Sequence, residues 1–105
     1  MNLPVKTKQE LIDRLLSNQE HITSYGVKRL GIFGSFVRDA AKETSDIDFY
    51  VDIAPEYKTL KNFIGLGDYL EQLTGRKIEL VTPQSLSKYI GPYILKEVEY
   101  VPLAA

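Results

Sequence analysis

The chain has 105 residues, of which 44% are hydrophobic and 26% charged, and its formal net charge at pH 7 is −1. This composition fits one globular domain spanning residues 1–105 and excludes a disordered chain. The near-neutral charge also argues against direct nucleic-acid binding, which needs a cationic surface.

The sequence contains no cysteine, so disulfides, thiol nucleophiles and thiolate zinc sites are excluded. It has no apolar run of about 18 residues, the length that a membrane-spanning helix needs. The first residues also lack the apolar core of a signal peptide. We therefore expect a cytosolic protein that does not enter a membrane.

Apolar spacing and turn residues predict an alternating order of helices and strands. The predicted helices cover about residues 6–24, 35–41 and 59–74, followed after residue 83 by one or two short helical pieces broken at Gly91-Pro92. The predicted strands cover residues 27–33, 46–53 and 77–81, and a final extended piece at 99–102 is expected to pair at a sheet edge. This order is typical of a two-layer α/β protein.

Alternation within the strand at 46–53 separates its acidic side chains from its apolar ones. Asp46 and Asp48 point to one face with their α-carbons about 6.5 Å apart, because successive side chains of a strand alternate. Two carboxylates at this spacing suit magnesium, which prefers hard oxygen ligands; the alternative is an ordinary solvated strand face. Tyr50 shares this face, where its ring is a candidate platform for a nucleobase. The opposite face is expected to enter the core and carries Ile47, Phe49, Val51 and Ile53.

A Gly34-Ser35 turn follows the first predicted strand. Glycine lets the backbone approach a ligand closely, and Ser35 offers a hydroxyl where a short helix begins. Free amides at a helix start attract phosphate, so this turn is a candidate phosphate site; the alternative is an ordinary strand-to-helix turn. Arg38 either neutralises the charge of a bound triphosphate or pairs with Asp39 or Glu43.

A third acid lies on a later strand. The segment 77–81 alternates again and places Glu79 on the face opposite to its apolar residues. If this strand lies beside strand 46–53 with its apolar face in the same core, Glu79 shares the side of Asp46 and Asp48. Converging carboxylates repel one another, so such a cluster is tolerated mainly where a metal neutralises it or protons are shared.

Gly34-Ser35, ten intervening residues, Asp46-x-Asp48 and the later Glu79 together resemble the pattern of the minimal nucleotidyltransferases. These are the smallest members of the polymerase-beta-like nucleotidyltransferase superfamily, and the resemblance covers nearly the whole chain. It implies the nucleotidyltransferase fold, a small mixed β-sheet of three to four strands flanked by helices. It also implies two magnesium ions held by the acids and a nucleoside triphosphate whose tail lies over the Gly-Ser turn.

Many proteins of this family look like antitoxins encoded beside a ribonuclease toxin of the HEPN class, and transfer AMP to a tyrosine of that toxin. The resemblance therefore implies magnesium-dependent transfer of AMP from ATP to a partner hydroxyl, with Glu79 helping to deprotonate that hydroxyl. The implied catalytic residues and metal ligands are Asp46, Asp48 and Glu79. The implied nucleotide-binding residues are Gly34, Ser35 and Arg38.

Two positions depart from the family pattern. Gly-Ser-x is usually followed by Ala-Arg-Gly, whereas this chain reads Val37-Arg38-Asp39. Aspartate tolerates a positive φ better than most non-glycine residues, so the turn is expected to survive, although Asp39 adds negative charge near a triphosphate. The third acid is more often aspartate, and the extra methylene of Glu79 moves its carboxylate outward by about 1 Å or more, which weakens in-line geometry unless it is compensated.

Three other functions are alternatives to AMP transfer to a partner protein: binding of a toxin without catalysis, transfer to a small molecule, and hydrolysis by a serine–histidine pair. If the departures at Asp39 and Glu79 have abolished catalysis, the chain would be a binding-only antitoxin, and replacing Asp48 by Asn would separate the two functions. Transfer to a small molecule is disfavoured, because no second domain remains to build an acceptor pocket. Serine–histidine hydrolysis is disfavoured, because Ser35 would need His21 as its base while the carboxylates had no role.

Overall fold

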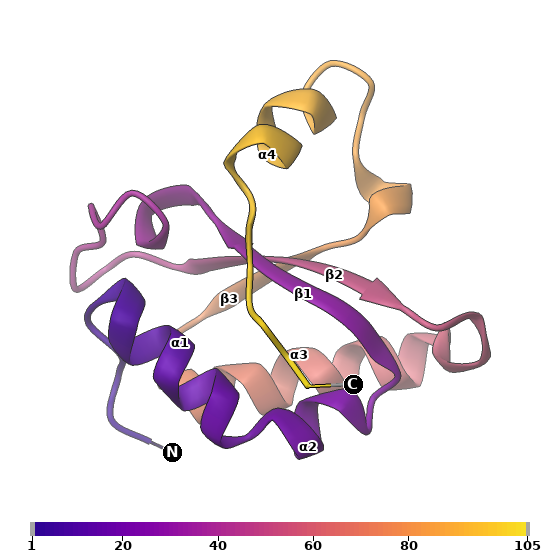
Figure 1. The fold of residues 1–105 in the computed structure, drawn as a ribbon, viewed down its shortest axis with the longest axis horizontal. Coiled ribbons are helices and arrows are strands. Elements are labelled where there is room, and N and C mark those ends of the chain that lie inside the picture. Colours follow the sequence, from indigo (N-terminus) through magenta and orange to yellow (C-terminus); the bar gives the residue numbers. More distant parts are fainter. Residues whose placement is uncertain (1, 105) are drawn as a thin grey trace.

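The computed structural model describes residues 2–104 and contains a four-stranded sheet in the order β3-β2-β1-β4 (Figure 1). The strands are β1 (Val27–Phe33), β2 (Ile47–Ile53), β3 (Ile78–Val81) and β4 (Glu99–Tyr100). β1 pairs antiparallel with both β2 and β4, whereas β2 and β3 pair in parallel. The sheet is therefore mixed, which confirms the predicted fold class and the edge position of the last strand.

Helices lie on both sides of this sheet. The helices α1 (Lys8–Ser17), α2 (Gln19–Thr23) and α3 (Leu60–Thr74) cover one face, and α4 (Gly91–Glu97) stands on the other (Figure 1). Among residues 2–104, no helix combines the length and the apolar character needed to cross a membrane.

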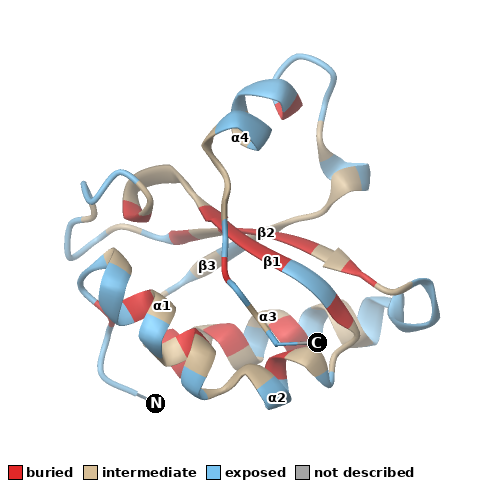
Figure 2. Cartoon of the chain, in the orientation of Figure 1, coloured by how far each residue is buried: buried red, intermediate tan, exposed pale blue. Residues whose placement is uncertain are grey.

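The core lies between the sheet and the layer formed by α1, α2 and α3 (Figure 2). Alternation in β2 sends Ile47, Phe49 and Val51 into this core, where each has 0% exposure. Side chains at helical spacing on α1 and α3 meet them and are equally buried: Leu11, Leu15, Leu66 and Leu70. Burial of each such side chain contributes about 1.5–3 kcal/mol. The opposite face of β2 is thereby left to polar side chains, as its alternation predicts.

The first predicted helix, residues 6–24, is in fact two helices. Thr7 caps the start of α1 with its side chain. Asn18 leaves the helical conformation, with φ −124° and ψ 23°, so α1 ends there and α2 begins. The apolar spacing continues across this break, because Leu15 and Ile22 are both fully buried. Periodicity alone therefore does not reveal it.

Two further helix predictions are corrected by the structure. The predicted helix at 35–41 is a short 3-10 turn, η1 (Gly34–Phe36), and Asp39 takes a left-handed conformation with φ 53° soon after it. Gly91-Pro92 begins α4 instead of breaking a helix. Proline is tolerated in the first turn of a helix, because the N–H that it lacks would have no partner within the helix there.

The remaining elements agree closely with the sequence prediction. Thr59 caps α3 and Gly75, with φ 69°, ends it, as the capping pattern indicates. The strands predicted at 46–53 and 77–81 each begin one residue later in the structure. These elements position the acids and the Gly-Ser turn of the candidate site.

Candidate active site

Asp48 and Glu79 stand side by side on the neighbouring parallel strands β2 and β3, where they are partners in the strand register. The prediction that these two strands are adjacent, with both acids on the face opposite to the core, is therefore confirmed. Asp48 is half-buried and Glu79 is exposed. Their β2 and β3 neighbours Ile47, Phe49 and Leu80 pack in or against the core, so the pair lies on the other side of the sheet. On that side stands α4 (Figure 1).

Asp46 lies just ahead of β2 and is exposed, and its negative charge acts on Asp48. As the side chains stand, the acids within residues 2–104 form no group of three arranged to hold one metal ion. The donor set nevertheless has the chemistry that magnesium prefers, because every group is a carboxylate. Metal binding by Asp46, Asp48 and Glu79 stays a prediction.

Asp48 is a carboxyl group whose pKa departs clearly from its ordinary value. Burial is the largest cause, and together with the charge of Glu79 and then of Asp46 and Glu97 it raises the pKa of Asp48 from 3.8 to about 6. Desolvation and like charges both disfavour the ionised form. A cation bound here would relieve both effects, so the arrangement favours cation binding.

Gly34 brings the turn after β1 against the carboxylate of Asp48. Phe33, the residue before it, is the register partner of Asp48 across β1 and β2. Gly34 has φ 77°, and a side-chain carbon at this position would overlap the Asp48 carboxylate. Both the conformation and the close approach require glycine. The group that approaches Gly34 here is the side chain of Asp48, and Ser35 lies half-buried next to the glycine. Close approach of this backbone to a phosphate stays a prediction.

Glu97, at the end of α4, reaches the same turn. Its carboxylate accepts a hydrogen bond from the backbone N–H of Gly34 and another, of 2.7 Å, from the guanidinium of Arg38. Arg38 thus pairs with Glu97, and with neither Asp39 nor Glu43, the partners that one of the two predicted alternatives named. The other alternative, binding of a triphosphate, stays a prediction. An amide and a guanidinium that together bind a carboxylate form an anion-binding pair. The local sequence does not single out Glu97, because it lies 59 residues from Arg38 along the chain.

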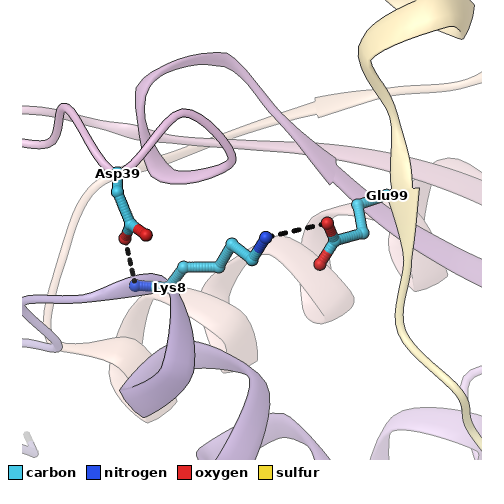
Figure 3. Close-up of polar contacts among 3 residues, drawn as sticks. All are labelled: Lys8, Asp39 and Glu99. Carbon is cyan, nitrogen blue, oxygen red and sulfur yellow. Dashed lines mark hydrogen bonds and ion pairs between the residues drawn. The ribbon is translucent and has the colours of Figure 1, made fainter.

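Asp39, which departs from the family pattern, points its carboxylate toward the start of α1 (Figure 3). Its Oδ1 accepts a hydrogen bond of 3.4 Å from the backbone N–H of Lys8. The Lys8 ammonium in turn bonds Glu99 at 2.8 Å, and this hydrogen bond raises the pKa of Lys8. A carboxylate at a helix N-terminus is favourable. The prediction that the turn tolerates Asp39 is confirmed by its positive φ of 53°.

Tyr50 has no free ring face for a nucleobase. It is only 4% exposed, and its ring meets that of Tyr100 edge-on with the centroids 6.2 Å apart. Stacking needs an open aromatic face. The prediction of Tyr50 as a base platform is therefore wrong. Gly31 of β1 lies between Tyr50 and Tyr100 in the strand register and has no side chain, so the ring of Tyr100 reaches across to that of Tyr50.

Comparison with known proteins identifies the class that this fold and site define. The model of the nucleotidyltransferase domain family matches residues 8–101, so the chain belongs to this family and is a nucleotidyltransferase. Its sequence is 41% identical over 96 residues to the protein adenylyltransferase MntA of Thermococcus cleftensis, covering 90% of this chain and 96% of that protein.

Solved structures narrow the class further. The structure of a protein provisionally described as a minimal nucleotidyltransferase matches this chain with a TM-score of 0.69 and 28% identity. The match covers 84% of this chain and 93% of that chain. A chain in the complex of the tri-AMPylated HEPN toxin of Shewanella oneidensis with MNT antitoxin matches with a TM-score of 0.63 and 16% identity, over 90% of this chain and 71% of that chain. The second likeness concerns the fold alone. Within its family, this chain is a minimal nucleotidyltransferase.

Proposed function

We propose that this nucleotidyltransferase is a magnesium-dependent protein adenylyltransferase that moves AMP from ATP onto a tyrosine hydroxyl of a HEPN-domain toxin and thereby acts as an antitoxin in the cytosol. The Thermococcus relative is named a protein adenylyltransferase, and the Shewanella complex pairs an MNT antitoxin with an AMPylated HEPN toxin. These relatives support the class of donor and acceptor.

The observation that carries the proposal is the close approach of Gly34 to Asp48, which has Glu79 as its neighbour on β3. A backbone amide suited to phosphate lies next to carboxylates suited to a divalent cation. Magnesium bound by Asp46, Asp48 and Glu79 would neutralise the charge on the phosphate oxygens of ATP. This combination favours transfer of a phosphate-linked group.

The amide of Gly34 and the guanidinium of Arg38 would hold the β- and γ-phosphates, with the hydroxyl of Ser35 as a further donor. Both groups already bind the carboxylate of Glu97, which supports their assignment as an anion-binding pair. Because one amide N–H does not serve two anions at once, the triphosphate would take the place of the Glu97 carboxylate.

The acceptor hydroxyl would then attack the α-phosphorus of ATP. An oxygen–phosphorus bond forms to the acceptor, the bond from the α-phosphorus to the β-phosphate oxygen breaks, and pyrophosphate leaves. Glu79 receives the proton of the hydroxyl. The acids would hold the magnesium ions that stabilise the negative charge, and the amide of Gly34 would help to position the triphosphate.

Incubation of the purified chain with a HEPN partner, magnesium and labelled ATP tests the proposal. We expect label on the partner, located on tyrosine by peptide mass spectrometry, and release of pyrophosphate. Chelation of the metal by EDTA should prevent the labelling. A folded sample that leaves a suitable acceptor unlabelled would contradict the proposal.

A binding-only antitoxin is the second candidate. It is favoured by the bonds of Glu97 to Gly34 and Arg38, because a triphosphate must displace them. The variant Asp48→Asn separates the two candidates. Inhibition of the toxin by occlusion should survive this substitution, whereas AMP transfer should be lost.

A further inference from the structure

Arg76, between the end of α3 and the start of β3, binds backbone carbonyls. Its Nε donates to the carbonyl of Val5 at 2.6 Å. One terminal nitrogen donates to the carbonyls of Lys42 and Ser45, both at 2.9 Å, and to that of Glu43 at 3.2 Å. Within residues 2–104 its guanidinium forms no ion pair with a carboxylate. The side chain therefore fixes backbone segments.

Three of these carbonyls belong to the loop that leads into Asp46. The loop closes on itself through hydrogen bonds between its first and last residues. Ser45 directly precedes Asp46, and Ile47, which directly follows it, donates its N–H to the carbonyl of Lys77 at 3.0 Å. Arg76 and Lys77 thus hold the backbone on both sides of Asp46.

The face of the same guanidinium covers the turn that follows β1. Its central carbon lies 5.1 Å from the ring centroid of Phe36, within the range of a cation–π contact. Phe36 is 1% exposed and belongs to the turn Gly34–Phe36. One side chain therefore contacts both the loop before Asp46 and the turn that supplies the Gly34 amide.

We propose that Arg76 is a positioning residue that keeps Asp46 and the turn Gly34–Phe36 in the relative place required for joint binding of metal and nucleotide. The inference rests on the proposed function and adds a residue to it. A planar guanidinium has five N–H donors in a fixed fork and an open face, so it donates to several carbonyls while its face covers a ring. A lysine ammonium has neither the fixed fork of donors nor the planar face. Loss of the fork frees the backbone of Asp46, and displacement of a reacting group by about 1 Å costs roughly 100-fold in rate.

Arg14 offers a matched control. Its guanidinium also donates to backbone carbonyls, those of Leu3 and of Leu73, the latter at 3.1 Å. These partners belong to neither the loop before Asp46 nor the turn at Gly34. Arg14→Ala should therefore lower stability without affecting the site.

The test compares the wild type, Arg76→Lys and Arg14→Ala in Mn²⁺ binding, followed by electron paramagnetic resonance with a non-hydrolysable ATP analogue present. Thermal unfolding is measured in parallel. We expect Arg76→Lys to weaken Mn²⁺ binding by about 10-fold or more, the range found for partners that orient metal ligands. The Mg²⁺ concentration for half-maximal transfer should rise by a similar factor. Arg14→Ala should keep the Mn²⁺ affinity within about two-fold while its Tm falls.

Wild-type Mn²⁺ affinity in Arg76→Lys, with a Tm lowered as in Arg14→Ala, would overturn the inference and leave Arg76 a purely structural role. Absence of Mn²⁺ binding in the wild type would overturn both this inference and the metal requirement of the proposed function. Strong Mn²⁺ binding in the wild type and weak binding in Arg76→Lys, without AMP transfer, would support the role of Arg76 and contradict the transferase proposal alone.

Discussion

Among single residues, Asp48 lowers the stability of the metal-free protein at neutral pH. Burial and the neighbouring Glu79 raise its pKa from 3.8 to about 6. Between these values the folded protein holds a proton that the unfolded chain has released, so stability falls as pH rises and the loss is complete above about pH 6. A shift of this size corresponds to at most about 3 kcal/mol. Because solvent screens this half-buried group, we expect about 1 kcal/mol.

Asp48→Asn should therefore stabilise the metal-free protein at pH 7.5 by about 1 kcal/mol while abolishing AMP transfer. The gain should shrink as the pH is lowered toward 4, where the wild-type carboxyl is also neutral. Denaturant unfolding across this pH range measures the difference. Asp52→Asn is the control on the same strand face, because Asp52 pairs with Arg29 at 3.7 Å, and it should retain transfer. Parallel pH curves for the wild type and Asp48→Asn would contradict the assignment.

Among the elements, α4 is the one that carries Glu97 to the turn after β1. Glu97→Gln keeps the length of the side chain but removes the charge that competes with a triphosphate. Hydrogen bonds to charged groups contribute about 1.5–3 kcal/mol, so we expect the KM for ATP to fall by roughly 10-fold. Steady-state kinetics of AMP transfer measures this change.

The control for this prediction lies two residues further along the chain. Glu99 pairs with Lys8 at 2.8 Å (Figure 3), so Glu99→Gln also removes a paired carboxylate but does not touch the anion-binding pair. Its KM for ATP should stay within about two-fold of the wild type. A higher KM in Glu97→Gln would mean that Glu97 helps to bind the nucleotide instead of competing with it.

Helices and strands whose ends or alternation are marked by neighbouring residues can be predicted from the sequence. A break in a helix cannot be predicted where the apolar spacing continues across it. Strand β2 is predictable because alternation is a property of neighbouring residues, and α3 because Thr59 and Gly75 mark its ends. The break at Asn18 is hidden, because the apolar spacing runs through it. At residues 35–41 the type of residue 39 is informative, because aspartate tolerates the positive φ that it takes, but the sequence does not predict the end of the helical turn at Phe36.

Across the whole molecule, the site residues that the sequence predicts are those marked by residues close to them along the chain. Asp48 and Gly34 are marked by their own neighbours, and Glu79 needs only the assumption that two strands share a core. Glu97 and Arg76 cannot be found in this way. Glu97 lies 59 residues from Arg38, and Arg76 lies 71 residues from Val5, so their partners are set by the packing of the complete fold.

At the scale of the whole molecule, the proposed binding of magnesium by Asp46, Asp48 and Glu79 should add stability, because a cation relieves the repulsion of Asp48 by its acidic neighbours. A ligand that binds only the folded state stabilises it in proportion to the logarithm of its concentration, by about 2.7 kcal/mol at ~100 times its Kd. At this concentration magnesium with a non-hydrolysable ATP analogue should therefore raise Tm by about 10–20 °C, because each kcal/mol shifts Tm by roughly 4–8 °C in a domain of this size. Sodium chloride at equal ionic strength is the control for general screening, and Asp48→Asn should lose most of the magnesium effect. An equal rise in Tm with sodium chloride, or in Asp48→Asn, would show that the cluster holds no specific cation.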